Sequence, residues 1–233
     1  MAGGAGRELT VFRTGRLPHN PARLAAVPQH VMAAETPPPL ELPRPGLVWT
    51  PTMARNDVLA SCCVAGLVNS LRLWCLAYHG FDLVVSDDML IAFFCEAAGC
   101  DQTEAAMEAV PGLVMLDVLE LAQRRGFDVG AQAPYVPEFK AIDPHDMTAL
   151  RDAVATQTAY VGVTLYRTDL LTPLNWNGTP IGDVDTGHCL VPGRYSTTGF
   201  VDATWGQEVP CDDDFLLTRI DECYAVRWTL AVA

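Results

Sequence analysis

The stretch Asn56-Asp57-Val58-Leu59-Ala60-Ser61-Cys62-Cys63-Val64-Ala65 stands where the pattern of the chain changes. Proline is frequent before it, whereas after it apolar residues recur at the spacing of an amphipathic helix, at positions 63, 64, 67, 68, 71, 74, 75 and 78. Ser61 is of a residue type preferred at an N-cap, and Gly80 ends the pattern, so the sequence predicts a helix over 62–78. The N–H groups at a helix start stabilise a thiolate, which makes Cys62 a candidate nucleophile.

A second stretch supplies a candidate base. His188 stands at the start of the apolar run Cys189-Leu190-Val191, and it follows Cys62 by 126 residues, a separation typical of a papain-type pair. Cys63 is the rival nucleophile, but one residue further along the helix it would face about 100° away and is expected to point into the core.

These residues resemble those of the papain-like cysteine peptidase superfamily. The family's Gly-Ser-Cys-Trp-Ala motif fits residues 60–65, and its oxyanion-hole Gln, six residues before the nucleophile, corresponds to Asn56. The family's His-Ala-Val strand matches His188-Cys189-Leu190-Val191, and its Asn-Ser-Trp-Gly segment lines up with Ala203-Thr204-Trp205-Gly206. The resemblance implies that Cys62 is the nucleophile, His188 the general base and Asn56 an oxyanion donor. Trp205 is expected to be a core aromatic or a lid that covers the histidine, rather than a platform for a ligand.

A closer resemblance is to a divergent and mostly uncharacterised branch found in tailed phages (bacteriophages) and some bacteria. It extends nearly from end to end of the chain. The matching motifs, in chain order, are Trp49, Asn56-Asp57, Cys62, Gly187-His188, Thr204-Trp205-Gly206 and Asp221-Glu222-Cys223-Tyr224-Ala225-Val226.

The chain departs from the family pattern at several positions. Ala203 stands where the family has the Asn that orients the histidine, and it cannot form a hydrogen bond with an imidazole. Asp202 is the candidate replacement, although in a strand it would face away from its neighbour unless a bulge turns it. Asn56 is one methylene shorter than the family's Gln, and Pro192 is expected to interrupt the histidine strand.

The remaining pattern predicts an α+β fold with a helical lobe first and an antiparallel sheet lobe after it. Further helices are expected over 86–98, 115–125 and 143–156, and strands over 159–166, 189–191, 199–203 and 223–232. Nine of the 17 prolines lie between Pro18 and Pro51, which predicts an extended arm over residues 1–55 and a papain-like domain over 56–233. The arm is expected to lie along the domain or to reach a partner; the alternative is a loose tail.

Composition limits the function. Fifteen basic and 28 acidic residues give a formal net charge of −13, which argues against nucleic-acid binding. The sequence contains no apolar run long enough to span a membrane and no recognisable secretion signal. The eight cysteines contain no CxxC pair, so no structural zinc site is expected, and most are expected to be buried thiols. The hydrolase interpretation implies no metal and no cofactor. The run Asp212-Asp213-Asp214 is expected to be a solvated turn.

Two functions follow from these observations. The first is a papain-like cysteine hydrolase, a thiol protease or amidase acting on a peptide or a cell-wall peptide. The second is a catalytically silent structural protein of a phage particle, in the tail or capsid, whose N-terminal arm contacts other virion proteins or another copy of the chain. In either case the protein is expected in the virion or the host cytoplasm.

Overall fold

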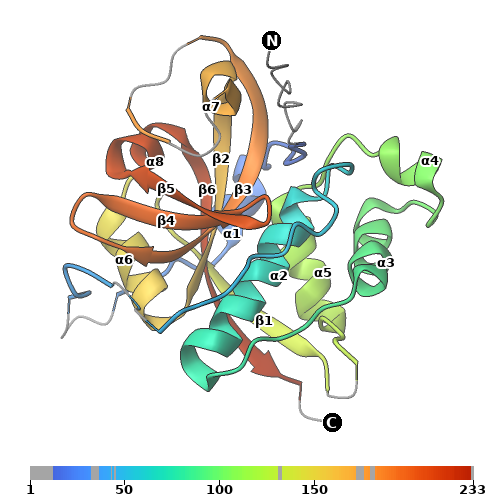
Figure 1. Cartoon of the computed structure of the whole chain (residues 1–233), viewed down its shortest axis with the longest axis horizontal. Helices are drawn as coiled ribbons and strands as arrows, with labels where there is room; N and C mark the ends of the chain where they lie inside the picture. Colours follow the sequence, from blue (N-terminus) through green and yellow to red (C-terminus); the bar gives the residue numbers. More distant parts are fainter. Residues whose placement is uncertain are drawn as a thin grey trace, which may run out of the picture.

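The computed structural model describes residues 13–32, 37–42, 44, 46–130, 133–171, 176–178 and 182–231. On one side of the molecule lie the helices between residues 62 and 125, and on the other lies most of a sheet with the helices of the second half of the chain (Figure 1). This is the predicted α+β arrangement of two lobes. In the described part of the chain, no helix combines the length and the apolar character needed to cross a lipid bilayer.

The helices of the first lobe follow the periodicity of the sequence. They are α2 (Cys62–Trp74) with its continuation η1 (Cys75–His79), α3 (Asp87–Ala98), α4 (Glu104–Glu108) and α5 (Met115–Arg125). The predicted helix over 62–78 is confirmed, and Gly80 ends it with a φ of 72°. Its last turn is a π-helix, which the spacing of apolar residues did not predict. Helices α3 and α5 are also confirmed, since the glycine that follows each one ends it as expected.

The strands form one six-stranded antiparallel sheet in the order β1-β6-β2-β3-β4-β5. Their bounds are β1 (Tyr135–Ala141), β2 (Thr158–Tyr166), β3 (Val184–Tyr195), β4 (Gly199–Thr204), β5 (Gln207–Asp212) and β6 (Ile220–Leu230). All four expected strands are present. The strands β1 and β5 were not predicted.

The expectation that Pro192 interrupts the histidine strand is wrong. Strand β3 pairs with β2 as far as Leu190 and with β4 from Val191 onward, and it continues through the proline. The register shifts between Pro192 and Arg194, so a bulge accommodates the residue that cannot donate to the ladder.

The helices of the second lobe are short: α6 (Met147–Thr156), α7 (Arg167–Leu171) and α8 (Asp213–Arg219). Helix α6 begins after Asp146, whose side chain accepts a hydrogen bond from the N–H of Ala149, and not at 143 as expected. The acidic run at 212–214 is not a solvated turn. Asp212 caps α8 by accepting from the N–H of Phe215 at 2.6 Å, and the two following carboxylates lie in the first turn, where the helix dipole favours them.

The described residues before α2 lie against both lobes. They include the short helix α1 (Pro21–Ala26) and form bridges to the body at three places: Arg16 with Gly187 and Leu113, Gln29 with Ala141, and Leu42 with Tyr195. The division into an arm over 1–55 and a domain over 56–233 stays a prediction.

Two apolar clusters cover the two faces of the sheet. One contains the buried faces of α2, α3 and α5, and the other lies under α6 and α8. Along β3, Cys189 and Val191 belong to the first cluster and Leu190 to the second, as alternation in a strand requires. Helix α2 therefore packs directly on β3, and this packing brings the start of α2 to the histidine strand.

Candidate active site

Cys62 is the first residue of α2 and is only 1 % exposed. Ser61 precedes the helix, as expected of an N-cap, but its hydroxyl donates to the carbonyl of Ala54 at 2.8 Å and makes no capping bond. The first N–H groups of α2 are therefore not capped by this side chain. They leave a positive electrostatic potential beside the Cys62 sulfur.

His188 lies near the start of β3 and is fully buried. Its Nε2 lies 2.6 Å from Oγ1 of Thr204. The indole of Trp205 stacks on the imidazole, with ring centroids 4.3 Å apart and planes 24° from parallel. The expectation that this tryptophan covers the histidine is confirmed. Trp205 and Gly206 have φ values of 43° and 72°, the positive angles of a two-residue hairpin turn, so the turn between β4 and β5 sets the place of the indole.

Thr204 is the hydrogen-bond partner of the histidine. The sequence analysis placed Thr204 in a motif but did not identify it as a site residue. Val191 pairs with Ala203, so Thr204 falls next to Leu190 and diagonal to His188 on the same face of the sheet. Ala203, the residue aligned with the family's orienting Asn, faces the opposite way and is buried in the cluster with α2. The Thr-Trp-Gly motif was visible in the sequence, but the strand register decides which of its residues faces the imidazole.

The structure does not place Asp202 on His188. Asp202 pairs with Pro192, four residues from the histidine, or about 13 Å along the strand. Its Oδ2 accepts a hydrogen bond from the Cys211 thiol at 2.5 Å, and its Oδ1 has no hydrogen-bond partner. Burial raises the pKa of Asp202 to about 7, although the bond from Cys211 opposes the shift. Asp202 is thus a buried carboxyl group away from the imidazole.

The thiol of Cys62 has the electrostatic environment of a nucleophile. Burial by itself would raise its pKa. The neighbouring Cys189, Cys63 and His188 lower it, although Nδ1 of His188 has no hydrogen-bond partner among the described residues. The net result is a pKa well below that of a free thiol. The structure thus places His188 near enough to Cys62 to lower the pKa of its thiol.

Cys63 and Cys189 lie beside this pair but have the opposite character. The thiol of Cys189 donates to the Cys63 sulfur at 3.4 Å, and that of Cys63 donates to the Leu113 carbonyl at 3.2 Å. Burial raises the pKa of both thiols well above the ordinary value. The sulfur atoms of Cys62, Cys63 and Cys189 lie within 4.8 Å of one another, close enough for one soft metal ion. Metal binding requires thiolates, and the two raised pKa values disfavour them, so we assign no metal here.

Asn56 is buried in the loop before α2. Its carbonyl accepts a hydrogen bond from the N–H of Arg13 at 3.3 Å, and its side-chain Oδ1 has no hydrogen-bond partner. The bond from Arg13 ties this loop to the N-terminal segment, and the oxyanion role of the Asn56 amide stays a prediction.

Residues 13–17 form an extended segment beside the pair. On the helical lobe, the N–H of Leu113 donates to the Gly15 carbonyl at 2.7 Å, and the N–H of Leu17 donates to the Leu113 carbonyl at 2.8 Å. A Cβ on Gly15 would lie 2.4 Å from that of Ala60, so the backbone approaches the start of α2 as closely as only glycine allows.

The same segment is bound to the sheet. The carbonyl of Gly187, the residue before the histidine, accepts hydrogen bonds from the N–H groups of Gly15 at 3.3 Å and Arg16 at 3.1 Å. The indole of Trp205 donates to the Arg13 carbonyl at 2.9 Å. The chain's own backbone therefore bridges the two lobes between the regions that carry the cysteine and the histidine.

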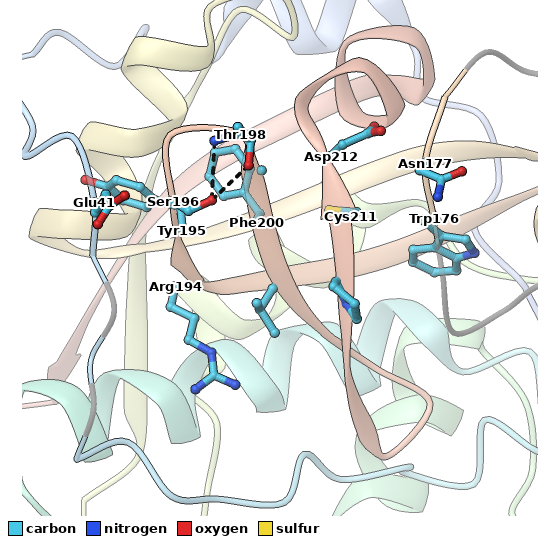
Figure 2. A pocket seen from close by; sticks show the side chains of 13 residues that line it. Glu41, Trp176, Asn177, Arg194, Tyr195, Ser196, Thr198, Phe200, Cys211 and Asp212 are labelled. Carbon is cyan, nitrogen blue, oxygen red and sulfur yellow. Dashed lines mark hydrogen bonds between the residues drawn. The ribbon is translucent and has the colours of Figure 1, made fainter.

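A pocket elsewhere on the sheet is separate from this site. It lies over β3, β4 and β5 (Figure 2). Its volume is about 490 Å³. Its lining includes Arg194, Asp212 and Cys211, but neither Cys62 nor His188. Arg194 is paired with Glu208, and Asp212 caps α8, so these polar groups are already used within the fold. We assign no function to this pocket.

No protein-family profile matches the sequence, and no curated protein sequence is similar to it. Solved structures are similar in fold. Xylellain, a cysteine protease from Xylella fastidiosa, is 11 % identical with a TM-score of 0.69, over 95 % of this chain and 98 % of that protein. The Amb a 11 cysteine protease, a ragweed pollen allergen, in its proform is 13 % identical with a TM-score of 0.63, over 94 % and 75 %. The Carica candamarcensis cysteine protease CMS1MS2 is 14 % identical with a TM-score of 0.53, over 73 % and 89 %. The chain has the fold of the papain-like cysteine proteases.

Proposed function

We propose that the protein is a cysteine peptidase in which Cys62 is the nucleophile and His188 the general base. The observation that carries the proposal is the pairing of a low-pKa thiol at the start of α2 with a buried histidine that Thr204 holds in place. A thiol in this environment is more reactive than a free cysteine at neutral pH. The papain-like fold supports the same reaction class.

The reaction follows from the positions of these groups. The Cys62 sulfur attacks the carbonyl carbon of a peptide bond, and the imidazolium of His188 gives its proton to the departing amine. A water molecule, deprotonated by His188, then hydrolyses the thioester and releases the acid. In the proposed mechanism, the N–H of Cys62 and the amide of Asn56 stabilise the negative charge on the carbonyl oxygen. The proposed steps require no metal or cofactor.

A peptide is the substrate class that best fits the surroundings of the pair. The 13–17 segment is itself a peptide, held extended by backbone hydrogen bonds from Leu113 and to Gly187. Such bonds hold an extended peptide whatever its side chains, as in other modes of strand addition. The substrate in this proposal is a protein or a cell-wall peptide, which binds after the segment has moved away.

The test is the rate of iodoacetamide alkylation at pH 5 to 9, with the modified cysteine mapped by mass spectrometry. We expect Cys62 to react faster than the other cysteines below about pH 7, under the pKa of about 8.5 of a free thiol, and to lose this advantage in His188→Ala. Hydrolysis of a casein substrate by wild type and not by Cys62→Ala then establishes turnover. The variant Arg16→Ala is included because it should loosen the 13–17 segment. The proposal fails if iodoacetamide alkylates Cys62 no faster than a free thiol in both wild type and Arg16→Ala, with both proteins folded.

The alternative is a catalytically silent structural protein of a phage particle. The observation that favours it is the burial of Cys62, in a structure whose own 13–17 segment is bound between Leu113 and Gly187, because a site that never opens has no turnover. This alternative predicts that Cys62 is alkylated no faster than a free thiol in every variant. It also predicts a stable complex with other particle proteins or with a second copy of the chain. Size-exclusion chromatography with light scattering, together with the alkylation profile, separates the two functions.

A further inference from the structure

We propose that Cys189 is the redox partner of Cys62: after a hydroperoxide oxidises the Cys62 sulfur, Cys189 attacks that sulfur and closes a disulfide that a thiol reductant reopens. Cys62, Cys63 and Cys189 are called the three-thiol cluster below. The inference rests on the proposed function, because it concerns the same nucleophile. It assigns a reaction to a thiol that the peptidase mechanism does not use.

The three thiols meet where α2 packs on β3. Their sulfur atoms lie within 4.8 Å of one another, and all three residues are buried. Gly66 lies one turn of α2 beyond Cys62, and a Cβ there would come within 3.3 Å of the Cys189 Cβ, so the helix lies directly against this strand position. Small side-chain rotations then bring two of the sulfur atoms to the bond distance of about 2 Å.

Cys62 is the thiol of the cluster that reacts with a peroxide, because the thiolate is the reactive form. Although burial opposes it, the neighbours of Cys62 hold its pKa well below that of a free thiol, whereas burial raises the pKa of Cys63 and of Cys189. In the first step the Cys62 thiolate attacks one oxygen of hydrogen peroxide. The S–O bond forms, the O–O bond breaks, and hydroxide leaves. The sulfur is oxidised to a sulfenic acid, and the peroxide is reduced.

Geometry selects Cys189 and not Cys63 as the second thiol. The Cα atoms of consecutive residues are about 3.8 Å apart, whereas a disulfide requires about 4.4 to 6.8 Å. The side chains of Cys62 and Cys63 also leave the helix about 100° apart. In the second step the Cys189 sulfur attacks the Cys62 sulfur. The S–S bond forms, the S–O bond breaks, and the hydroxyl group leaves with the thiol proton as water.

The charge of Cys62 controls when Cys189 reacts. Burial raises the pKa of Cys189, and a hydrogen bond with Cys62 is the next cause that raises it. The first step converts the Cys62 thiolate into an uncharged sulfenic acid, so this second cause is lost. The guanidinium of Arg16 interacts electrostatically with Cys189 and favours its thiolate. Cys189 is therefore a poor nucleophile while Cys62 is reduced and a better one after Cys62 is oxidised.

Burial favours a partner within the chain. Cys62 is 1 % exposed, which excludes a bulky thiol such as a tripeptide but not hydrogen peroxide, a molecule little larger than water. A sulfenic acid that meets no thiol is oxidised further to a sulfinic acid, which thiol reductants do not reverse. The disulfide with Cys189 keeps the nucleophile in a form that can be reduced.

The test treats full-length, reduced protein with hydrogen peroxide in the presence of EDTA. Free thiols are then blocked with N-ethylmaleimide under denaturing conditions, and peptides are mapped by mass spectrometry without reduction. We expect a Cys62–Cys189 disulfide in wild type, and dithiothreitol should reopen it. In Cys189→Ala, which has the residue of the family's His-Ala-Val strand, Cys62 should give at least about fivefold more sulfinic acid than in wild type.

The matched control is Cys223→Ala, which removes another buried thiol of the same sheet, on β6, outside the three-thiol cluster. It should form the Cys62–Cys189 disulfide as wild type does. The sulfur of Cys63 lies 3.4 Å from that of Cys189, so Cys63 can take over Cys189 by exchange. A Cys63–Cys189 disulfide that is absent from Cys62→Ala therefore also supports the proposal.

Two results overturn the proposal and leave the peptidase function intact. One is a folded wild type in which Cys62 becomes a sulfinic acid while Cys189 stays a free thiol. The other is a disulfide of Cys189 that forms equally well in Cys62→Ala. If Cys62 resists both peroxide and iodoacetamide, in wild type and in Arg16→Ala, the inference and the proposed function fail together. Formation of the disulfide without hydrolysis of casein supports the inference and counts against the peptidase.

Discussion

At the scale of single residues, a threonine carries out the positioning that the family assigns to an asparagine. The Thr204 hydroxyl either accepts from or donates to Nε2 of His188, so it fixes the orientation of the ring without supplying a negative charge. An uncharged partner stabilises the imidazolium less than a carboxylate would. The low pKa of Cys62 accordingly draws on the neighbouring thiols as well as on the histidine.

We predict that Thr204→Val reduces the alkylation rate of Cys62 at pH 6 by about tenfold and lowers the free energy of unfolding by about 1–3 kcal/mol, because Nε2 of His188 is left buried without a partner. Thr204→Ser keeps the hydroxyl and should retain most of both quantities. Iodoacetamide kinetics and urea unfolding measure them. Equal rates in the valine and serine variants would show that the hydroxyl does not position the histidine.

Asp202 should give stability an unusual dependence on pH. Its pKa is raised to about 7 by burial, so the folded protein keeps the proton in a range where the unfolded chain has lost it. The contribution of Asp202 to stability is therefore fully present below about pH 4, falls as the pH rises to about 7 and stays constant above. The full fall is at most about 4 kcal/mol, from a shift of about three pH units.

The variant Asp202→Asn isolates this contribution, because an amide resembles the protonated acid and can still accept from Cys211. We predict that the unfolding free energy of Asp202→Asn rises relative to wild type between pH 4.5 and pH 7.5. Chemical denaturation at several pH values measures the difference. Parallel curves for the two proteins would contradict the prediction.

At the scale of secondary-structure elements, the site depends on how closely α2 approaches the sheet. Gly66 lies on the buried face of α2, where a Cβ would come within 2.6 Å of the Tyr160 ring and 3.3 Å of the Cys189 Cβ. The Tyr160 hydroxyl donates to the Cys63 carbonyl at 2.7 Å and so ties β2 to the first turn of the helix. Gly66 costs helix propensity but permits this close contact.

Gly66→Ala should therefore lower the free energy of unfolding by about 1–3 kcal/mol, although alanine is the better helix former, because the fully buried Tyr160 has little room to move. The control is Gly46→Ala, where a Cβ meets nothing within 4 Å and the change should stay within about 0.5 kcal/mol. Urea unfolding monitored by circular dichroism compares the two. A stabilised Gly66→Ala would mean that α2 can shift on the sheet.

At the scale of the whole molecule, the 13–17 segment connects the two lobes between the regions that carry Cys62 and His188. The 13–17 segment has backbone hydrogen bonds to Leu113 on one lobe and Gly187 on the other, and Arg16 anchors it through two carboxylates. Opening of the site then requires this segment to leave, which replaces a buried ion pair by hydrated charges. In the proposed peptidase, the thiol of Cys62 would thus be protected until the segment moves.

We predict that Arg16→Ala raises the alkylation rate of Cys62 by at least about tenfold, because loss of the buried ion pair removes a substantial part of the closing free energy. The matched control is His30→Ala, at another position of the N-terminal region. It removes a buried contact of 2.8 Å between His30 Nε2 and Oδ2 of Asp152 in α6, and it should leave the alkylation rate of Cys62 unchanged. Alkylation at fixed pH with mass-spectrometric mapping gives both rates. A similar rise in the two variants would indicate general loosening of the fold.

Local patterns were enough to predict the helices that carry the site. The apolar spacing after Cys62 and the glycines at 80, 99 and 126 are signals within one element, so the bounds of α2, α3 and α5 followed from the sequence. The motifs around Cys62 and His188 were likewise enough for the papain-like fold. Helix α6 and the 212–214 run were predicted less well, because the residue that caps a helix is chosen among several adjacent candidates.

Other features were decided only by the tertiary structure. Whether Ala203 or Thr204 faces the histidine depends on the register between β3 and β4, and a slip of one residue reverses every side chain. Arg16 meets Asp221 across 205 positions of sequence, with no periodic signal to announce the contact. Periodicity records which face of an element is buried. Which residues meet across elements depends on strand pairing and helix packing, and these are properties of the whole fold.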